Sequence, residues 1–316
     1  MIRLRGGVPL IELERSGVVE SVHTGHLLVL AGDGSVRFAA GEPDQPIFAR
    51  SSLKPLQAAG LLRAGTDLGP AELALAASSH SGSPQHQQLI ADELRAAGLS
   101  EDDLECPPDL PLGEVERRAH LMAGRAETRL AMNCSGKHAG MLLACLRNGW
   151  PVSGYLAPSH PLQQLLAATV AELTGGPIPV TGVDGCGAPL FATTLTGLAR
   201  SFTRIATGRA ELRRVAEALR AHPDLVGGTG RAATRLMQAV PGLIAKDGAE
   251  GVFAAALPDG GAVAVKIDDG AARAADLAVV AGLRQLGVPA AALDELASAP
   301  VLGGGRPVGV LRPVVG

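Results

Sequence analysis

Aromatic residues, lysine and long apolar runs are all scarce in this 316-residue sequence. Aromatic residues make up 2% of the chain although apolar residues make up 47%, so we expect a core packed from small aliphatic side chains. No apolar run is long enough to span a membrane, which predicts no membrane partner. The opening stretch, MIRLRGGVPLIELERS, contains no apolar run typical of an export signal. We therefore expect a cytoplasmic protein.

Charge and cysteine content exclude further classes. The formal net charge is −3, which does not favour binding to nucleic acid or to an anionic membrane surface. Four cysteines occur, with no CxxC pair, so neither a disulfide framework nor a zinc ribbon is expected. They are Cys106, Cys134, Cys145 and Cys186.

Only four of the 28 basic residues are lysines, so arginine serves the general cationic purposes. A lysine amine can lose its proton, which an arginine guanidinium cannot do in a protein. Three of the four lie in small-residue motifs: Lys54 in SSLK, Lys137 in CSGK and Lys246 in AKDGAEG. These three positions are therefore candidates for proton-transfer or ligand chemistry.

Hairpins are predicted near both ends of the chain. VVESVHTGHLLVLA and SVRFAA flank a turn at residues 32–34, and VFAAALP and AVAVKID flank a DGG turn. Helical periodicity predicts helices at about 52–63, 70–77, 84–98, 136–148, 160–174, 209–221, 230–240 and 271–286. Residues 107–112 (PPDLPL) predict a rigid extended connection. The order of these elements predicts an α+β fold with three layers, αβα. Both hairpins would form one antiparallel sheet, and the helices between them would form a helical lobe. No boundary is evident, so a single domain over 1–316 is expected.

The stretch NCSGKHAG resembles a phosphate-binding loop at first sight. A Walker A loop requires glycine at position 131 and serine or threonine after the lysine. Here those residues are Ala131 and His138, so a nucleotide site is not expected.

Ser51 and Lys54 lie three residues apart at the predicted start of a helix, so their side chains share one face. Backbone N–H groups at a helix N-terminus stabilise an oxyanion, and a desolvated lysine can serve as the base for a serine nucleophile. The alternative is that Ser51 only caps the helix.

Serines also gather between two predicted helices, in SSHSGSPQH. Ser83 precedes Pro84 and is predicted to cap a helix. Ser79 and Ser81 have no such role, and are either catalytic or part of a solvated turn.

Two further motifs carry chemistry. AKDGAEGV places Lys246 beside glycine just before a strand, as in the K-T-G element of serine β-lactamases, or else it is a hairpin entry with a solvated lysine. Cys134 and the distant Cys186 are, by spacing alone, either small core residues or metal ligands.

Taken together, these motifs resemble the Rhizobium-type, or asparaginase II, family of L-asparaginases. The motifs that carry the resemblance are FARSSLKPLQ (48–57), SSHSGSPQH (78–86), NCSGKHAGM (133–141), VDGCGAP (183–189), GGTGR and AKDGAEGV (245–252). The CSGKH and DGCGAP motifs are the specific ones. The chain departs from the family after Cys106, where PPDLPL replaces an expected glycine and histidine or aromatic residue.

The resemblance implies a β-lactamase-like fold, a homodimer, and hydrolysis of L-asparagine to L-aspartate and ammonia. It implies Zn²⁺, structural or substrate-orienting, bound by Cys134, Lys137 and Cys186 with water. It also implies two Ser–Lys pairs. Ser51 with Lys54 forms the first. The second joins Ser79, Ser81 or Ser83 to Lys246, with Lys266 as the lesser candidate.

Three residues are expected to contact the substrate. Asp184 would pair with its α-ammonium group, and Arg50 would hold either its α-carboxylate or the frame of the site. His138, beside Lys137, is the third. The alternative functions are a serine β-lactamase or D,D-peptidase, a glutaminase-type amidohydrolase, and a non-catalytic zinc-stabilised sensor domain.

Overall fold

The computed structural model describes residues 4–315 and divides the chain into two compact units. Unit 1 contains the chain up to Ser52, Thr193–Thr207 and the chain from Leu236 on. Unit 2 contains Leu53–Ala192 and Gly208–Arg235, so its sequence is inserted into that of unit 1. The single domain over 1–316, whose first three residues and last residue lie outside the described ones, stays a prediction.

An antiparallel sheet forms unit 1, with strand order β10-β11-β1-β2-β9-β8-β7 and β3 beside β2. Its N-terminal strands are β1 (Val8–Arg15), β2 (Val18–Leu30) and β3 (Val36–Ala40). Its later strands are β7 (Ile244–Gly248), β8 (Val252–Ala256), β9 (Ala262–Ile267), β10 (Ala299–Gly303) and β11 (Arg306–Pro313). The two predicted hairpins meet where β2 pairs with β9. This pairing confirms the α+β fold with one sheet formed from both ends of the chain.

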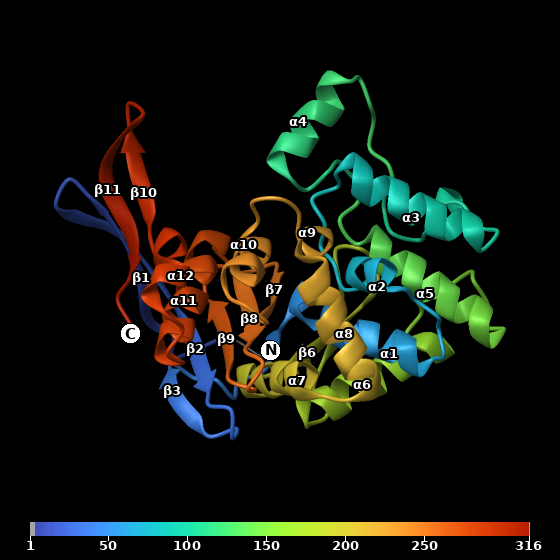
Figure 1. The fold of residues 1–316 in the computed structure, drawn as a ribbon, viewed down its shortest axis with the longest axis horizontal. Helices are drawn as coiled ribbons and strands as arrows, with labels where there is room; N and C mark the ends of the chain where they lie inside the picture. Colours follow the sequence, from blue (N-terminus) through green and yellow to red (C-terminus); the bar gives the residue numbers. More distant parts are fainter. Residues whose placement is uncertain (1–3, 316) are drawn as a thin grey trace. The chain divides into compact units, whose positions relative to one another are not determined.

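Small side chains let helices pack closely on this sheet. Strands β8 and β9 are buried along their whole length and are rich in alanine. Helices α7 (Leu195–Thr207) and α11 (Ala272–Gln285) both pack on β2, β8 and β9 (Figure 1). A Cβ atom at Gly282 of α11 would lie 2.4 Å from Val263 Cγ1, so a larger residue there would separate the layers.

Helices dominate unit 2. They are α1 (Lys54–Arg63), α2 (Pro70–Ala76), α3 (Pro84–Ala96), α4 (Glu114–Met122), α5 (Ser135–Asn148), α6 (Pro161–Thr174), α8 (Ala210–Ala221) and α9 (Pro223–Val226). A short 3-10 turn, η1 (Arg50–Leu53), leads into α1, and α10 (Ala232–Ala239) leads back into unit 1. The predicted helices agree with these within a few residues at their ends, and Ser83 caps α3 as predicted, its hydroxyl accepting a hydrogen bond from the His86 N–H.

Several elements differ from the prediction. Sequence analysis did not predict β1, α4, the short pair β5 (Thr181–Val183) and β6 (Pro189–Thr193), α7, α12 (Ala290–Leu293), or the C-terminal hairpin of β10 and β11. Residues 244–248, expected only to lead into a strand, are themselves the edge strand β7.

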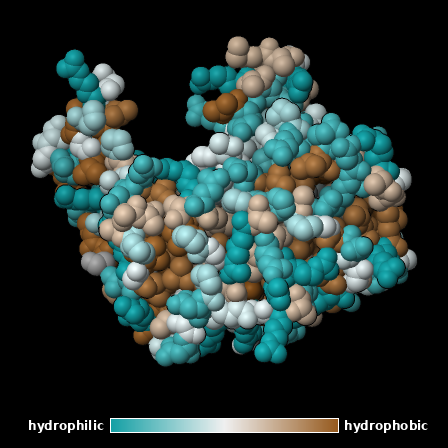
Figure 2. All heavy atoms as spheres, in the orientation of Figure 1, coloured by the Kyte–Doolittle hydropathy of each residue, from teal (hydrophilic) through white to brown (hydrophobic). Residues whose placement is uncertain are grey.

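Helix α4 stands apart from the other helices of unit 2 in Figure 1. Val115, Leu121 and Met122 are exposed on it, and Figure 2 shows brown and tan atoms in that region. Only His120 is buried, because its ring reaches back to the Ala126 carbonyl, 2.7 Å from Nε2. Among the helices of residues 4–315, none has both the length and the apolarity that crossing a bilayer demands.

Candidate active site

Two glycines on α5 explain the GKHAG sequence. A Cβ atom at Gly136 would lie 2.6 Å from the Leu75 carbonyl oxygen, and one at Gly140 would lie 2.8 Å from Leu61 Cδ1. These glycines, four residues apart, therefore form the face of α5 that packs against α1 and α2. The close packing buries the first turn of α5, including Lys137 and His138. The glycines serve helix packing, in agreement with the exclusion of a nucleotide loop.

Lys54 is buried at the start of α1, with 1% of its surface exposed. Its ammonium group donates to three acceptors of unit 2: the Ser78 carbonyl at 2.5 Å, Ser79 Oγ at 3.1 Å and Cys134 Sγ at 3.0 Å. Because a buried ammonium needs a partner for each proton, this set satisfies it fully. Lys54 thus joins the serine-rich loop to the cysteine at the start of α5, and can exchange a proton with the Ser79 hydroxyl.

The three candidate serines of this loop have different partners. Ser79 faces Lys54, whereas Ser81 Oγ donates to the Gly227 carbonyl at 3.0 Å and Ser83 caps α3. Ser79 and Ser81 are 3% and 1% exposed, so the solvated-turn interpretation of both is wrong. Of the three, the structure brings Ser79 to a lysine.

His80 is a site residue that sequence analysis missed. Its Nδ1 accepts the Gly82 N–H at 3.1 Å, so its Nε2 carries the proton and lies 2.9 Å from Ser135 Oγ. Ser135 in turn donates to the Leu130 carbonyl. Burial places the pKa of His80 well below its ordinary value, so the ring is neutral and acts as a fixed link between the serine loop and α5. Its place inside SSHSGS was the available signal.

The three predicted zinc ligands lie together in unit 2. Lys137 Nζ donates to Cys186 Sγ at 3.1 Å, and Cys134 and Cys186 are hydrogen-bonded to each other. That thiol contact lowers the pKa of Cys186, helped by the Lys137 ammonium, and raises the pKa of Cys134, helped by burial. Burial opposes the charge of Lys137, but the two sulfurs raise its pKa. Cys186 therefore carries the thiolate of this group.

The two thiols of this group are soft donors of the kind that suit zinc, and three protein ligands would leave a position for water. The Lys137 amine could serve as a ligand only after losing its proton. No cluster of three histidine, cysteine, aspartate or glutamate side chains occurs within the part of the chain that the structure describes. All four cysteines are free and buried.

His138 and Asp184 border the cysteine group. His138 is fully buried, with Nδ1 2.7 Å from Tyr155 Oη, and burial lowers its pKa although the Cys186 side chain opposes the shift. Asp184 is half-buried in the turn before Cys186, where its carboxylate accepts the Gly185 N–H and raises the pKa of Lys137. Asp184 is thus more accessible than His138.

Arg50, Ser51 and Lys246 belong to unit 1. Ser51 is half-buried in η1, three residues before Lys54 on one continuous helical stretch, and Arg50 before it has a left-handed φ of 52°. Lys246 is fully buried in β7, where its ammonium donates to the carbonyl and the carboxylate of Asp247, each at 2.7 Å. The interpretation of Lys246 as a solvated hairpin lysine is therefore wrong.

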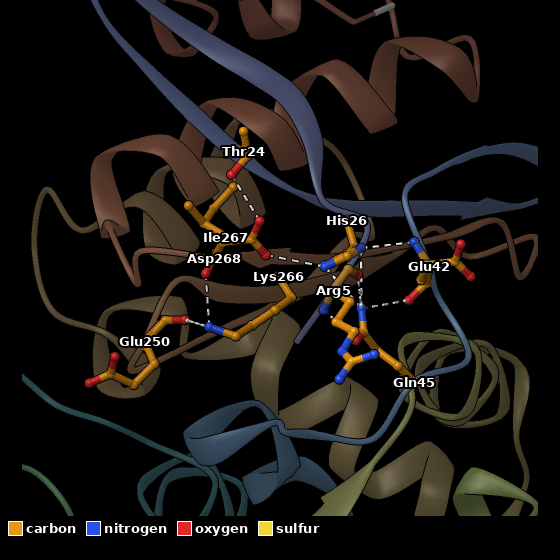
Figure 3. Close-up of polar contacts among 9 residues, drawn as sticks. All are labelled: Arg5, Thr24, His26, Glu42, Gln45, Glu250, Lys266, Ile267 and Asp268. Atoms are coloured by element: carbon orange, nitrogen blue, oxygen red, sulfur yellow. Dashed lines mark hydrogen bonds and ion pairs between the residues drawn. The ribbon is translucent and has the colours of Figure 1, made fainter. Parts of the chain in front are cut away.

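Lys266, the lesser candidate, is also buried in unit 1, and Figure 3 shows its polar contacts. Its ammonium donates to the carbonyls of Glu250 at 2.5 Å and of Ile267 at 2.8 Å. Burial lowers its pKa, while Glu250 and nearby aspartates oppose the shift. Both contacts are to backbone oxygens, so Lys266 holds backbone and not a serine.

Comparison with known proteins separates the family from more distant likenesses. No curated protein matches the sequence. A putative β-lactamase from Bacteroides dorei is 16% identical, with a TM-score of 0.43 over 77% of this chain and 84% of its own. A β-lactamase from Mycobacterium bovis is 15% identical, with a TM-score of 0.41 over 86% of this chain and 94% of its own. The L-asparaginase II family profile, however, matches residues 11–313. By that match over nearly its whole length, the chain is a member of the L-asparaginase II family.

Proposed function

We propose that the protein hydrolyses the side-chain amide of L-asparagine, giving L-aspartate and ammonia, with Ser51 as the nucleophile. The observation that carries the proposal is Lys54, a buried amine that contacts the Ser79 hydroxyl and follows Ser51 by three residues in the sequence. A family of amide hydrolases supplies the reaction class, and the Ser–Lys arrangement supplies a nucleophile and its base.

The first step forms a bond between Ser51 Oγ and the amide carbon. We assign Lys54 as the base that accepts the serine proton as the bond forms. The oxyanion is stabilised by the Ser51 N–H at the start of the helical stretch. The C–N bond then breaks, ammonia leaves with an added proton, and water hydrolyses the ester to aspartate and free Ser51.

Ser79 is the proton carrier in this scheme. Its hydroxyl accepts a hydrogen bond from Lys54, so a proton can pass between hydroxyl and amine without movement of either residue. Ser81 and Ser83 hold backbone groups and serve the loop itself. We assign Lys246 as the second lysine, following the family motif, since its burial beside Asp247 sets it apart from a solvated residue.

Zn²⁺, if bound, would be held by Cys134, Lys137 and Cys186, and would supply a fixed positive charge that orients a substrate. Binding requires both thiols as thiolates and Lys137 as a neutral amine. Because Cys186 has already lost its proton, zinc binding would release two protons, one from Cys134 and one from Lys137. Asp184, next to this group, is the proposed partner of the substrate α-ammonium group, and Arg50 that of the α-carboxylate. We further expect a homodimer.

A substrate panel on purified protein tests the proposal. We expect repeated turnover of L-asparagine with release of ammonia, weaker turnover of L-glutamine and of a β-aspartyl peptide, and no cleavage of nitrocefin. Ser51→Ala should reduce turnover by several powers of ten, on the order of the loss of a covalent nucleophile, with an unchanged circular dichroism spectrum.

Other outcomes name the alternatives. Nitrocefin cleavage without ammonia release would indicate a β-lactamase, and faster turnover of glutamine a glutaminase. A single acylation without turnover would indicate a sensor. Near-native turnover by Ser51→Ala would refute the serine mechanism itself.

A further inference from the structure

Left-handed backbone at non-glycine residues is concentrated beside the proposed nucleophile. Among residues 4–315, only Ser16, Arg50, Ala210 and Glu250 are non-glycine residues with positive φ. Two of these four, Arg50 (52°) and Glu250 (61°), form an ion pair with Nη1 and Oε1 4.0 Å apart. A left-handed conformation is unfavourable for a residue with a Cβ atom, so neighbouring contacts must hold both residues in it.

The backbone around Arg50 rests on strand β7. A Cβ atom at Gly248 would lie 2.7 Å from the Ala49 carbonyl oxygen and 2.9 Å from Ser52 Oγ, so the chain that carries Ser51 lies directly against this glycine. Ser52 is fully buried and its hydroxyl donates to the Lys246 carbonyl at 3.2 Å. The position of residues 49–52 therefore depends on where β7 and the turn after it are held.

Strand register connects that turn to Lys266. Gly248 pairs with Val252, Val252 pairs with Lys266, and Lys266 pairs with His26, which places these residues in one row on one face of the sheet. From this row the Lys266 side chain reaches the turn and donates to the Glu250 carbonyl (Figure 3). Its second contact, to the Ile267 carbonyl, fixes the ammonium group to its own strand.

The other end of the row is equally fixed. His26 is fully buried, its Nδ1 accepts the Glu42 N–H at 2.8 Å, and its Nε2 lies 3.1 Å from Asp268 Oδ1. Asp268 also accepts from the Thr24 hydroxyl at 2.8 Å, as Figure 3 shows. The strand end that carries Lys266 thus has little freedom, and the ammonium group transmits that rigidity to the Glu250 turn.

We propose that Lys266 is a positioning residue for Ser51, which it holds through the Glu250 turn and the left-handed Arg50. The inference rests on the proposed function of Ser51. Lys266 contacts backbone carbonyls and no hydroxyl, so its role is to keep residues 49–52 in the geometry that attack requires. A misplacement of about 1 Å at a nucleophile lowers a rate by up to about 100-fold, which sets the scale of its effect.

Paired substitutions at position 266 test this role. Lys266→Met keeps the length of the side chain but removes its donors, and we expect kcat for L-asparagine to fall about 10- to 100-fold with KM within about threefold. Lys266→Arg retains donors for both carbonyls, and should recover most of that loss. A proton-transfer role would instead leave Lys266→Arg as inactive as Lys266→Met, and would overturn the proposal.

A second pair of variants guards against a Lys266→Met protein that does not fold. Glu250→Gly adopts a positive φ without strain, so it should fold, but it frees the turn and removes the partner of Arg50. We expect kcat to fall by about 3- to 10-fold. Ser16→Gly, at a left-handed residue in the β1–β2 turn, is the matched control and should leave kcat unchanged.

Mass spectrometry of quenched reactions separates the inference from the function on which it rests. We expect an acyl group on Ser51 in the natural protein, and slower acylation in Lys266→Met and Glu250→Gly. Absence of the acyl group from the natural protein would overturn the proposed function and with it the inference. Equal acylation rates in all folded variants would overturn the inference alone.

Discussion

Glu93, on α3, should make the folded protein less stable as the pH rises. Both of its carboxylate oxygens are buried, and neither has a hydrogen-bond partner among the described residues. Burial, with a smaller contribution from Glu72, raises its pKa to about 8 from an ordinary value of 4.5. The folded protein therefore keeps a proton on Glu93 in a pH range where the unfolded chain has released it.

The sign and size follow from these two pKa values. Below pH 4.5 the carboxyl group is protonated in both states, and above pH 8 it is ionised in both, so neither range adds further change. Between them, each pH unit lowers the free energy of unfolding by at most about 1.4 kcal/mol. At pH 7 the loss amounts to about 3 kcal/mol, and it reaches an upper limit of about 5 kcal/mol above pH 8.

Glu93→Gln isolates this contribution, because the amide has the same shape and does not ionise. Urea unfolding followed by circular dichroism at pH 5, 7 and 8.5 should show that the free energy of unfolding of the variant increases relative to that of the natural protein as the pH rises. Gln85→Glu, at an exposed position of the same helix, is a control that should show no such divergence. Parallel stability curves for Glu93→Gln and the natural protein would refute the reasoning.

Further predictions concern the candidate site. Lys54→Arg should be nearly as inactive as Lys54→Ala in ammonia release, because a guanidinium does not deprotonate; substantial activity at neutral pH would make Lys54 a purely electrostatic group. Ser79→Ala should lower kcat far more than Ser81→Ala, whose main effect should be on thermal stability; the reverse order would move the proton carrier to Ser81. Elemental analysis should find about one zinc per chain, lost in Cys134→Ser or Cys186→Ser, and no metal in protein purified without chelator would refute the ligand set. Removal of zinc with a chelator should raise KM by a larger factor than it lowers kcat. A large fall in kcat at constant KM would mean that the metal takes part in the chemical step.

Sequence patterns predicted those elements in which apolar residues recur at a clear spacing. The β8–β9 hairpin and α5 combine apolar periodicity with clear turn or capping residues, so local physics decides them. The sequence of α4, EVERRAHLM, buries only one side chain and gives no apolar stripe. Strands β10 and β11 have mostly half-buried or exposed residues, and the pairing of β11 with β1 depends on a partner about 300 positions away.

Residue types in the site were predictable, but their pairing was not. Three serines within five residues are equivalent in sequence, and only the path of the loop decides which one meets Lys54. That path is fixed by the His80 contact with Ser135, which no local pattern contains. In the same way Lys246 and Lys266 look alike in the sequence, as lysines in or beside strands. In the structure Lys246 contacts the Asp247 carboxylate, whereas Lys266 contacts two backbone carbonyls.

The pairing of β1 with β11 has a consequence for folding during synthesis on the ribosome. Ile11 lies opposite Pro313, so the β1 edge stays unpaired until the residues of β11 have been synthesised. An unpaired strand edge invites association with other chains, so this interval exposes the nascent chain to misassembly.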